Sequence, residues 1–242
     1  MKLKDKRIVV TGGTKGLGRA LLERFVAEGA RVATCARTAK DVDAIRQAFP
    51  PGSLFPFVCD ISNSHDVEGF VASAVLSLGT VDVLVNNASR LGTRVPVAEY
   101  SLREWDDTIQ TNINGPFFIT RLIIPLMAKR GSGCIINVSS SVGRAARRGW
   151  GAYAVSKFAL EGLTQLLADE LRPFNIRVNS VNPGPMSTDM RKAAYPDEDH
   201  SKLRSPGQLT DLFVYLASQD GVGMSGQAFD ASTYIANPQI VS

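Results

Sequence analysis

The 242-residue chain lacks long hydrophobic runs, and this absence bears on where the protein works. No apolar run approaches the length of a membrane span. The apolar Ile8–Val10, which follows a charged first segment, is too short for a signal peptide. We therefore expect a soluble cytoplasmic protein with no membrane partner.

Metal-binding residues are also scarce. The chain has 2 histidines, His65 and His200, and 3 cysteines without a C-x-x-C pair. Isolated histidines argue against a metal cluster, so we expect no metal site and expect both histidines to be exposed. Cys35, Cys59 and Cys134 all fall in apparent strands and their number is odd, which favours buried free thiols over disulfides.

A strong charge of one sign is missing as well. The net charge is +4, with acidic and basic residues interspersed, which gives little support for a nucleic-acid surface but would suit a small anionic ligand. A hydrophobic share of 44% with 21% charged residues is ordinary for a globular protein. The length fits one α/β domain or two smaller ones, and we favour one domain over residues 1–242.

What the chain does have is a regular alternation of strand and helix patterns. The predicted strands are Arg7–Val10, Ala30–Ala36, Leu54–Val58, Val81–Val85, Cys134–Val138, Asn175–Val181 and Ala228–Asp230. The clearest predicted helices are Ser64–Leu78 and Pro206–Ser218, the latter as the last helix. Apolar strands without polar alternation, separated by helices, predict a doubly wound parallel sheet.

A glycine-rich turn follows the first predicted strand. Gly12, Gly16 and Gly18 let the backbone turn tightly and let a pyrophosphate approach the positive start of the next helix. The G-x-x-x-G-x-G spacing differs from the standard G-x-G-x-x-G, and no Gly-Lys-Ser/Thr is present to make a P-loop. The turn is typical of a dinucleotide cradle, although any tight strand-to-helix connection can use such glycines.

The second predicted strand ends at Arg37 without the acidic residue that would bind both ribose hydroxyls of NAD. Asp41 and Asp43 come next, but inside the following helix, where they are poorly placed to replace it. Arg37 and Lys15 of the glycine turn offer two cations to a 2′-phosphate, which favours NADP(H). The alternative is a pair of solvated loop charges.

Tyr153 and Lys157 open a long predicted helix that begins near Gly149 and ends at about Leu171. Their spacing places both side chains on one helix face. A cation beside a phenol lowers a pKa that is ordinarily about 10, so Tyr153 could exchange a proton near neutral pH. For an isolated Y-x-x-x-K, the alternative is a core tyrosine with a solvated lysine.

Ser140 follows the predicted strand Cys134–Val138. Ligands bind beyond the carboxyl ends of strands in open α/β sheets, so Ser140 is expected at the mouth of a site. The alternative is a serine that satisfies loop backbone groups, a role open equally to Ser139 and Ser141.

Asn112 lies in a predicted helix that begins at Glu99 or Ser101 and contains Gly115-Pro116. That pair should disturb the helical hydrogen bonds and free backbone carbonyls near Asn112, which is otherwise only a polar residue at a kink. Residues 186–205, rich in charge, are expected to form a substrate loop, as a mobile segment or as short helices over a pocket.

The motifs occur in a definite order: Thr11-Gly12…Gly16…Gly18, Asn86-Asn87-Ala88, Asn112, Ser140, Tyr153…Lys157 and Pro183-Gly184…Thr188. In this order and spacing, nearly the whole chain resembles the classical short-chain dehydrogenase/reductase (SDR) family. The resemblance implies a single Rossmann domain with a seven-stranded parallel sheet. It also implies an NADP(H)-dependent oxidoreductase for a small-molecule carbonyl or alcohol, acting as a homodimer or homotetramer.

The resemblance assigns roles to four residues. Tyr153 matches the general acid/base at the substrate oxygen, and Ser140 the hydroxyl that orients and polarises it. Lys157 matches the residue that binds the nicotinamide ribose and lowers the Tyr153 pKa, and Asn112 the holder of a proton-relay water. With Tyr153 and Lys157, the implied cofactor-binding positions are Gly12, Thr14, Lys15, Gly16, Leu17, Gly18, Arg37, Asp60, Ile61, Asn87, Ala88, Pro183, Gly184 and Thr188.

Two departures from the family pattern limit this transfer. The usual Asn-Asn-Ala-Gly ends here in Ser89, whose side chain could alter the loop beside the cofactor. The usual C-terminal Asp-Gly-Gly reads Asp230-Ala231-Ser232 and is followed by residues 233–238, which puts the familiar tetramer contact in doubt.

The substrate is the least determined feature. Two predicted loops at the pocket mouth carry the arginines Arg90, Arg94, Arg144, Arg147 and Arg148. They form either a solvated basic rim or a receiver for an anionic substrate, such as an acyl thioester carrier or a carboxylated ketone. The rival to an enzyme is an NADP-binding regulatory or scaffold protein with vestigial chemistry, but such a protein would not need all four catalytic residues.

Overall fold

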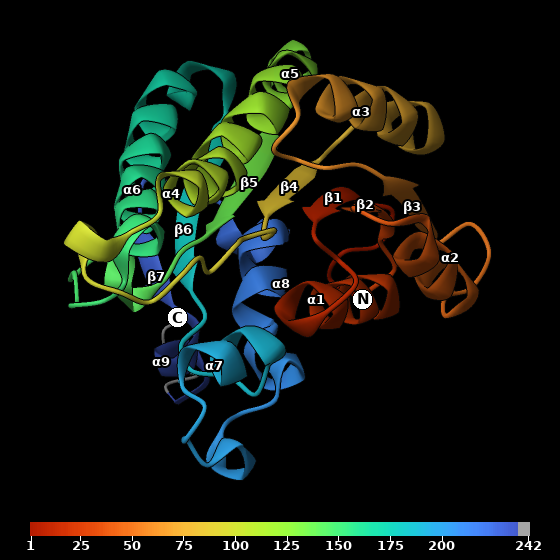
Figure 1. Ribbon diagram of the computed structural model, residues 1–242. Helices are drawn as coiled ribbons and strands as arrows, with labels where there is room; N and C mark the ends of the chain where they lie inside the picture. The colour runs from red at the N-terminus through yellow and green to blue at the C-terminus, as the bar shows by residue number, and fades with distance from the viewer. Residues whose placement is uncertain (237–242) are drawn as a thin grey trace.

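The computed structural model describes residues 1–236 and contains a seven-stranded sheet in the order β3-β2-β1-β4-β5-β6-β7 (Figure 1). Every strand pair is parallel. The strands are β1 (Arg7–Thr11), β2 (Arg31–Ala36), β3 (Leu54–Val58), β4 (Val83–Asn86), β5 (Gly133–Val138), β6 (Ile176–Asn182) and β7 (Ala228–Asp230). The predicted doubly wound parallel sheet is confirmed.

Helices cover both faces of this sheet (Figure 1). They are α1 (Gly16–Ala27), α2 (Ala39–Gln47), α3 (Ser64–Leu78), α4 (Leu102–Ile109), α5 (Gly115–Arg130), α6 (Gly151–Glu170), α7 (Asp189–Ala194), α8 (Asp211–Ala217) and α9 (Ala231–Ala236). The predicted substrate loop contains α7 and a short 3₁₀ turn at His200–Lys202. Of the two expectations for this loop, the one of short helices is correct.

The strands have apolar runs because both of their faces are buried. Ile8 and Val10 of β1 belong to one core cluster, with side chains of α1 and α8. Val9, between them, belongs to the other cluster, with side chains of α3, α5 and α6. Successive strand side chains point to opposite faces, so one apolar run supplies two cores.

The predicted long helix around Asn112 is interrupted, as its Gly-Pro pair suggested. Helix α4 ends at Ile109, Gln110–Asn114 form a π-helical turn, and α5 begins at Gly115. Pro116 lies in the first turn of α5 and has no N–H to donate to the preceding turn, and the π-helical turn just before it accommodates this. The wide turn therefore resolves the conflict between a continuous apolar helix and the proline within it.

Some predictions about the second half of the chain are wrong. The helix expected at Pro206–Ser218 is split into a 3₁₀ turn at Pro206–Leu209 and the short α8. It is also not the last helix, because α9 follows β7. Of the unusual C-terminal segment, residues 237 and 238 lie outside the described residues.

The cysteines and histidines need smaller corrections. The three cysteines are buried free thiols as expected, but Cys59 follows β3 instead of lying in a strand. His65 is exposed, whereas His200 is half-buried, with Nε2 3.2 Å from the carbonyl oxygen of Tyr195.

Within residues 1–236, no group of three or more histidine, cysteine or acidic side chains is placed to hold a metal ion. None of the described helices is both long and apolar enough to span a bilayer.

Candidate active site

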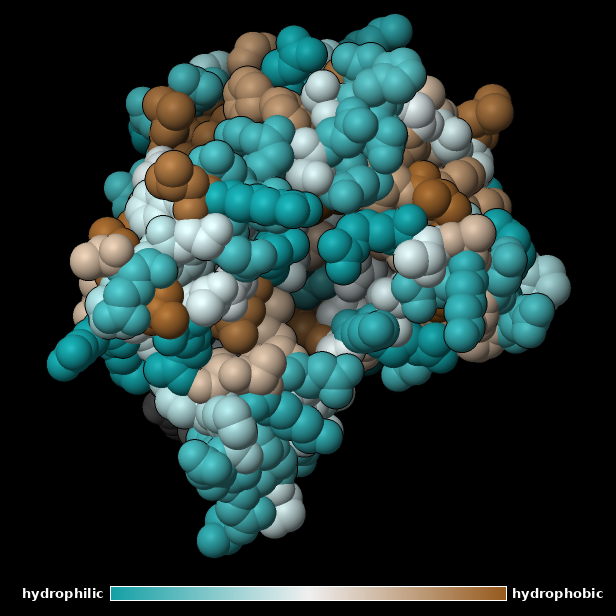
Figure 2. Space-filling view, in the orientation of Figure 1, coloured by the Kyte–Doolittle hydropathy of each residue, from teal (hydrophilic) through white to brown (hydrophobic). Residues whose placement is uncertain are grey.

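The predicted site segments all follow the carboxyl ends of strands and therefore meet at one edge of the sheet. The glycine turn follows β1, Arg37 follows β2, Asp60-Ile61 follow β3 and Asn87-Ala88 follow β4. Ser140 follows β5, and the segment with Pro183, Gly184 and Thr188 follows β6. The strand order reverses between β1 and β4, which is where open α/β sheets bind ligands. Figure 2 shows a hollow near the centre of one face, with hydrophobic residues inside and hydrophilic ones on its rim.

The glycine turn is shaped as a cradle for an anion. Gly12 has φ +69°, and a Cβ there would lie 2.9 Å from the Cα of Ala88. A Cβ on Gly18 would lie 2.1 Å from the Gly12 carbonyl oxygen, so neither position has room for a side chain. Helix α1 begins at Gly16 with no side-chain cap and no acidic residue in its first turn. Its first N–H groups are thus available to a pyrophosphate, and the residues present fit a dinucleotide.

The end of β4 holds this turn in place. The Asn87 side chain donates to the carbonyl oxygens of Thr11 (2.9 Å) and Gly12 (3.1 Å). In return, the Thr11 hydroxyl accepts from the backbone N–H groups of Asn87 and Ala88, both at 3.0 Å. Asn87 therefore stabilises the glycine turn. Thr11 stabilises the same turn, a role that its presence in the sequence motif did not predict.

The cations predicted to bind a 2′-phosphate are accessible. Lys15 and Arg37 are exposed, and neither forms an ion pair among the residues that the structure describes. The Thr38 side chain caps the start of α2 by accepting from the Asp41 N–H, and its hydroxyl donates to the Asp41 carboxylate at 2.8 Å, so Asp41 is committed to its own helix. A cavity of about 480 Å³ borders the same turn and is lined by residues that include Gly16 and Thr188.

The remaining cofactor positions are held by local contacts. The Asp60 carboxylate accepts from the backbone N–H and the hydroxyl of Ser62, at 2.9 and 2.7 Å. The Thr188 side chain caps α7 and faces Gly16, where an added Cβ would lie 3.2 Å from its methyl group. Gly184 has φ +80° and donates its N–H to the Asn182 side chain at 3.1 Å. These turns fix the backbone around the cleft.

Tyr153 and Lys157 lie in the first turns of α6 and are both buried, at 7% and 2% exposure. The Lys157 ammonium is 5.5 Å from the centre of the Tyr153 ring, as the helical spacing predicts. It donates to the Val138 carbonyl oxygen at 2.8 Å, at the end of β5. The alternative of a solvated lysine is therefore wrong, whereas Tyr153 does belong to a core cluster, as the same alternative supposed.

The pKa values differ from the sequence-based expectation. Burial raises the pKa of Tyr153 to about 12, although hydrogen bonds from Ser140 and Ser89 act in the opposite direction. Burial lowers the pKa of Lys157 to about 8, although Glu161 raises it. The predicted lowering of the Tyr153 pKa by Lys157 is wrong in this structure, because desolvation of the phenol outweighs its favourable contacts.

Ser140 is the one of the three neighbouring serines that acts on Tyr153. Its side chain lowers the pKa of that phenol, and its hydroxyl accepts from the Val142 N–H at 3.4 Å. Ser141 is exposed, and the buried Ser139 hydroxyl has no hydrogen-bond partner among residues 1–236. The three neighbouring serines are thus distinguished by position, and only Ser140 lies in the candidate site.

Asn112 is buried within the π-helical turn, and its amide is bound at both ends. Its oxygen accepts from the Arg90 N–H at 2.7 Å and from the Ser89 hydroxyl at 3.1 Å. Its nitrogen donates to the Arg90 carbonyl oxygen at 2.9 Å and to the Ser156 hydroxyl at 3.0 Å. The kink therefore places Asn112 where it joins α6 to the loop after β4. Ser89 is a site residue that the sequence marked only as a departure from a motif.

Two of the loop arginines are paired with acids inside the protein. Arg90 pairs with Glu104, and Arg144 pairs with Glu161 and Asp230 at 3.0 and 2.9 Å. Their guanidinium groups are thus occupied, so the expected role as substrate receivers does not apply to them.

The Arg94 guanidinium also has partners within the protein. Its contacts define an aromatic wall, formed by Trp150 and Tyr195, that the sequence did not predict. Arg94 donates to the Ala194 carbonyl oxygen and lies over the rings of Trp150 and Tyr195, 4.7 and 4.6 Å from their centres. Trp150 lies 5.5 Å from the Tyr153 ring, so this aromatic group borders the phenol. Trp150 is three residues before Tyr153, but nothing in the sequence pairs it with Tyr195. Arg147 and Arg148 are exposed and remain candidates.

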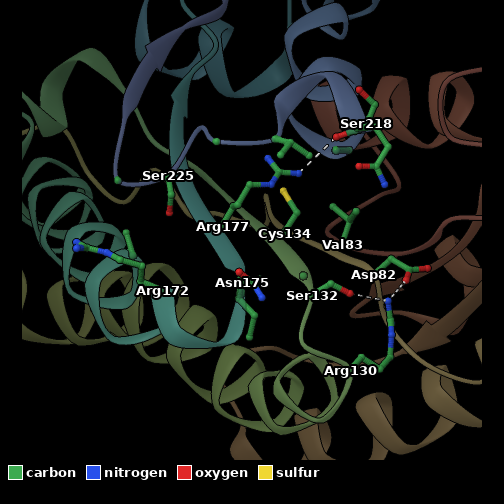
Figure 3. Close-up of a pocket in the computed structure, with 18 of the residues that line it drawn as sticks. Asp82, Val83, Arg130, Ser132, Cys134, Arg172, Asn175, Arg177, Ser218 and Ser225 are labelled. Atoms are coloured by element: carbon green, nitrogen blue, oxygen red, sulfur yellow. Dashed lines mark hydrogen bonds and ion pairs between the residues drawn. The ribbon is translucent and has the colours of Figure 1, made fainter.

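A larger cavity, of about 730 Å³, lies at the opposite edge of the sheet (Figure 3). Asp82 at this edge accepts from Arg7 at 2.8 Å and from Arg130. Arg177 donates to the Gly221 carbonyl oxygen at 2.7 Å. None of the predicted site residues lines this cavity, and its acidic groups pair with arginines, so we place the chemistry at the carboxyl edge.

The strand order and the glycine cradle define a dinucleotide-binding Rossmann fold, with Ser140, Tyr153 and Lys157 at the same edge of the sheet. The sequence profile of the short chain dehydrogenase family matches residues 6–199. The oxidoreductase YciK of Escherichia coli (strain K12) is 34% identical over 234 residues, 95% of this chain and 92% of YciK. The chain therefore belongs to the short-chain dehydrogenase family.

Solved structures agree with this assignment. A short chain dehydrogenase of Shigella flexneri 2a str. 301, complexed with NADP, has a TM-score of 0.89 at 34% identity. The match covers 96% of this chain and 99% of that one. A short chain dehydrogenase of Escherichia coli CFT073, complexed with NADPH, has a TM-score of 0.88 at 34% identity, covering 95% and 98% of the two chains.

Proposed function

We propose that this protein is an NADP(H)-dependent oxidoreductase that interconverts a carbonyl and a hydroxyl, with Tyr153 as general acid/base. The observation that carries the proposal is the buried Tyr153, with the buried Lys157 ammonium 5.5 Å from its ring centre, on a site edge shared with the glycine cradle. We propose that residues 1–242 act as one domain, supported by a sheet that runs unbroken from β3 to β7. A cytoplasmic location stays a prediction.

The glycine turn and α1 would hold the pyrophosphate, and Lys15 and Arg37 the 2′-phosphate. Two similar structures contain NADP or NADPH, which supports this choice. When bound, the nicotinamide exchanges a hydride with the substrate carbon. Lys157 would bind the nicotinamide ribose, and Ser140 would orient the substrate oxygen.

Tyr153 would transfer the proton that balances the hydride. In reduction, its hydroxyl gives the proton to the substrate oxygen and becomes a phenolate; in oxidation, the phenolate takes the proton back. Because burial holds the pKa of Tyr153 at about 12, the phenol is protonated at neutral pH. This favours carbonyl reduction as the forward reaction.

The aromatic wall supports a substrate with an apolar group next to its carbonyl. Trp150, Leu91, Tyr195 and Ala194 cluster with Tyr153, whereas three of the five loop arginines are occupied elsewhere. An anionic substrate would depend on Arg147 and Arg148 alone.

Oligomer formation is supported by exposed apolar side chains on α5 and α6. Phe117, Val155, Phe158 and Leu166 are all exposed. Paired α5 and α6 faces of two copies would cover them, giving a homodimer or homotetramer whose mass light scattering would measure.

The test is NADPH oxidation with a panel of ketones, quinones and β-keto thioesters, comparing the wild type with Tyr153→Phe. We expect turnover in the wild type and a fall of about 10²-fold to 10⁴-fold in the variant, since general acid catalysis contributes about that much. Tight NADPH binding without turnover would favour the regulatory or scaffold alternative. Turnover that survives in Tyr153→Phe would remove Tyr153 from the mechanism.

A further inference from the structure

The turn that carries Ser140, residues 140–144, lies directly against α6. Its Gly143 N–H donates to the Ser140 carbonyl oxygen at 2.9 Å. A Cβ on Gly143 would lie 2.7 Å from the Cβ of Lys157 and 2.8 Å from its carbonyl carbon, so the turn touches the helix backbone itself. Just before the turn, the Lys157 ammonium binds the Val138 carbonyl oxygen at 2.8 Å. The position of Ser140 therefore depends on how this turn is held on α6.

Arg144 ends the Ser140 turn, and its side chain joins the turn to α6 and to β7. Its Nε donates to the Glu161 carboxylate at 3.0 Å. One terminal nitrogen donates to the Asp230 carboxylate at 2.9 Å, and the other to the Phe229 carbonyl oxygen at 3.0 Å. All three nitrogens of the guanidinium thus have an acceptor, one on the helix and two on the strand.

The two acidic acceptors are themselves fixed by β6. The Glu161 side chain is 11% exposed, and its second oxygen accepts from the Ser180 hydroxyl. The second oxygen of Asp230 accepts from the Asn182 side chain. The guanidinium is therefore bound to groups that α6, β6 and β7 hold in place, and the Ser140 turn is anchored to the sheet through it.

Acceptors in two elements suit a guanidinium better than an ammonium. Arginine presents N–H groups from three nitrogens in one rigid plane, whereas lysine has a single nitrogen on a flexible stem. A lysine at position 144 would have to share that one nitrogen between Glu161 and Asp230. We therefore expect it to hold the turn less firmly.

We propose that Arg144 is a positioning residue that fixes the Ser140 turn on α6, and so orients the Ser140 hydroxyl toward the substrate oxygen. The inference rests on the proposed function, in which Ser140 orients that oxygen beside Tyr153. Arg144 has no contact with substrate or cofactor in this scheme and acts through Ser140. A residue that the sequence suggested as a receiver of an anionic substrate thus has a different role at the same site.

The first test is a double-mutant cycle on kcat for the ketone that the wild type reduces with NADPH. Arg144→Met removes all three hydrogen bonds and should lower kcat by about 10-fold to 100-fold, since a misplaced orienting group costs about that much. In a Ser140→Ala background, Arg144→Met should cause little further loss, because the hydroxyl that it positions is already absent. The same fold-loss in both backgrounds would show that Arg144 does not act through Ser140 and would overturn the inference.

A second variant guards against a failure to fold. Arg144→Met leaves the Glu161 carboxylate buried without its cation, which destabilises a protein strongly. Glu161→Gln added to Arg144→Met removes that charge and keeps an amide oxygen for the Ser180 hydroxyl. This double variant should show the same loss of kcat, and Arg144→Lys a smaller one. Wild-type kcat in the double variant would refute the proposal.

Arg24→Met is the matched control. Arg24 also pairs with two acids, Glu28 and Asp211, but it lies on α1 and contacts no residue of the Ser140 turn. Its loss should lower the melting temperature and leave kcat unchanged. If Arg24→Met lowered kcat as much as Arg144→Met, the effect of Arg144 would be one of general stability, and the inference would fail.

Hydrogen exchange tests the turn without turnover. The Gly143 and Arg144 N–H groups donate within the turn, at 2.9 and 3.2 Å, and should exchange faster in the Arg144 variants but not in Arg24→Met. Unchanged exchange would overturn the inference. A wild type without turnover would defeat the proposed function, and exchange would still decide whether Arg144 fixes the turn. A wild type whose turnover depends on Tyr153, with normal kcat in Arg144→Met, would defeat the inference alone.

Discussion

Replacing Arg37 by aspartate should reverse the choice between NADPH and NADH. Arg37 follows β2 directly, where an acidic residue would bind the two ribose hydroxyls of NAD. No acidic side chain compensates nearby, because the Asp41 carboxylate accepts from the hydroxyl of Thr38, the residue that caps α2. Arg37→Asp therefore removes a cation for the 2′-phosphate and introduces the missing carboxylate.

The magnitude follows from the exposure of the cations. A charge-assisted hydrogen bond contributes about 1.5 to 3 kcal/mol, but Arg37 and Lys15 are both exposed, and solvent screening reduces this to a combined value of about 1.4 kcal/mol or somewhat more. That is a preference for NADPH of about tenfold. Loss of the arginine, together with about 1 kcal/mol of repulsion between carboxylate and phosphate, should weaken NADPH binding by about 30-fold. A new hydrogen bond to the ribose of NADH adds about 1 kcal/mol in the other direction.

The assay is a fluorescence titration that gives the Kd of each cofactor at low and at high salt. The wild-type preference should shrink with salt, because exposed charges are screened. Arg46→Asp is the matched control: it makes the same change of charge at an exposed arginine of α2 that pairs with Asp43, and should leave the ratio unchanged. Equal Kd values for NADPH and NADH in the wild type would refute the reasoning.

The remaining predictions concern the cradle, the pH dependence and the rim. Gly18→Ala should lower the free energy of unfolding by about 1 to 3 kcal/mol and abolish NADPH binding, because its Cβ would lie 2.1 Å from a backbone oxygen. Gly69→Ala, at a helical position with open space, should raise the free energy of unfolding slightly. Thermal unfolding of the two variants measures these changes in stability. Carbonyl reduction should not lose activity through Tyr153 ionisation near neutral pH, while oxidation should rise with pH, because the phenolate forms only as pH approaches a pKa of about 12; a pH profile in which oxidation fell with pH would contradict this. Arg147→Ala and Arg148→Ala should lower kcat/KM for anionic substrates only, and less so at high salt; unchanged kinetics on anionic and neutral ketones would make the two arginines a solvated rim.

The strands and the site edge were predictable because their signals are local. The central strands are buried on both faces and are recognisable as apolar runs. The edge strands β3 and β7 are only partly buried, yet they were also predicted to the residue. Helix α3 was equally clear, with Asn63 capping its start and Gly79 at φ +83° ending it. Once the strand ends were known, the parallel topology placed the segments of the site at a common edge.

The side-chain contacts of the candidate site join residues that are far apart in the sequence, so no sequence pattern predicts them. Arg144 pairs with Asp230, 86 positions away, and Arg94 reaches Ala194, 100 positions away. The sequence also placed Lys157 near Tyr153 correctly but not the burial of both, and burial reversed the expected pKa change. Spacing reports which side chains share a face, whereas desolvation depends on everything packed around them.

The π-helical turn at Gln110–Asn114 makes this part of the chain sensitive to its length. Deleting one residue there would convert the π-helical turn to a regular α-helix and leave α4 and α5 in nearly the same relation, because the wider turn holds one extra residue. It would, however, remove the widened turn that positions Asn112. Asn112 could then no longer meet Arg90 on one side and Ser156 on the other. A deletion variant could thus have a more regular helix and yet a disordered active site. We therefore expect insertions and deletions to be selected against at this turn even where substitutions are tolerated.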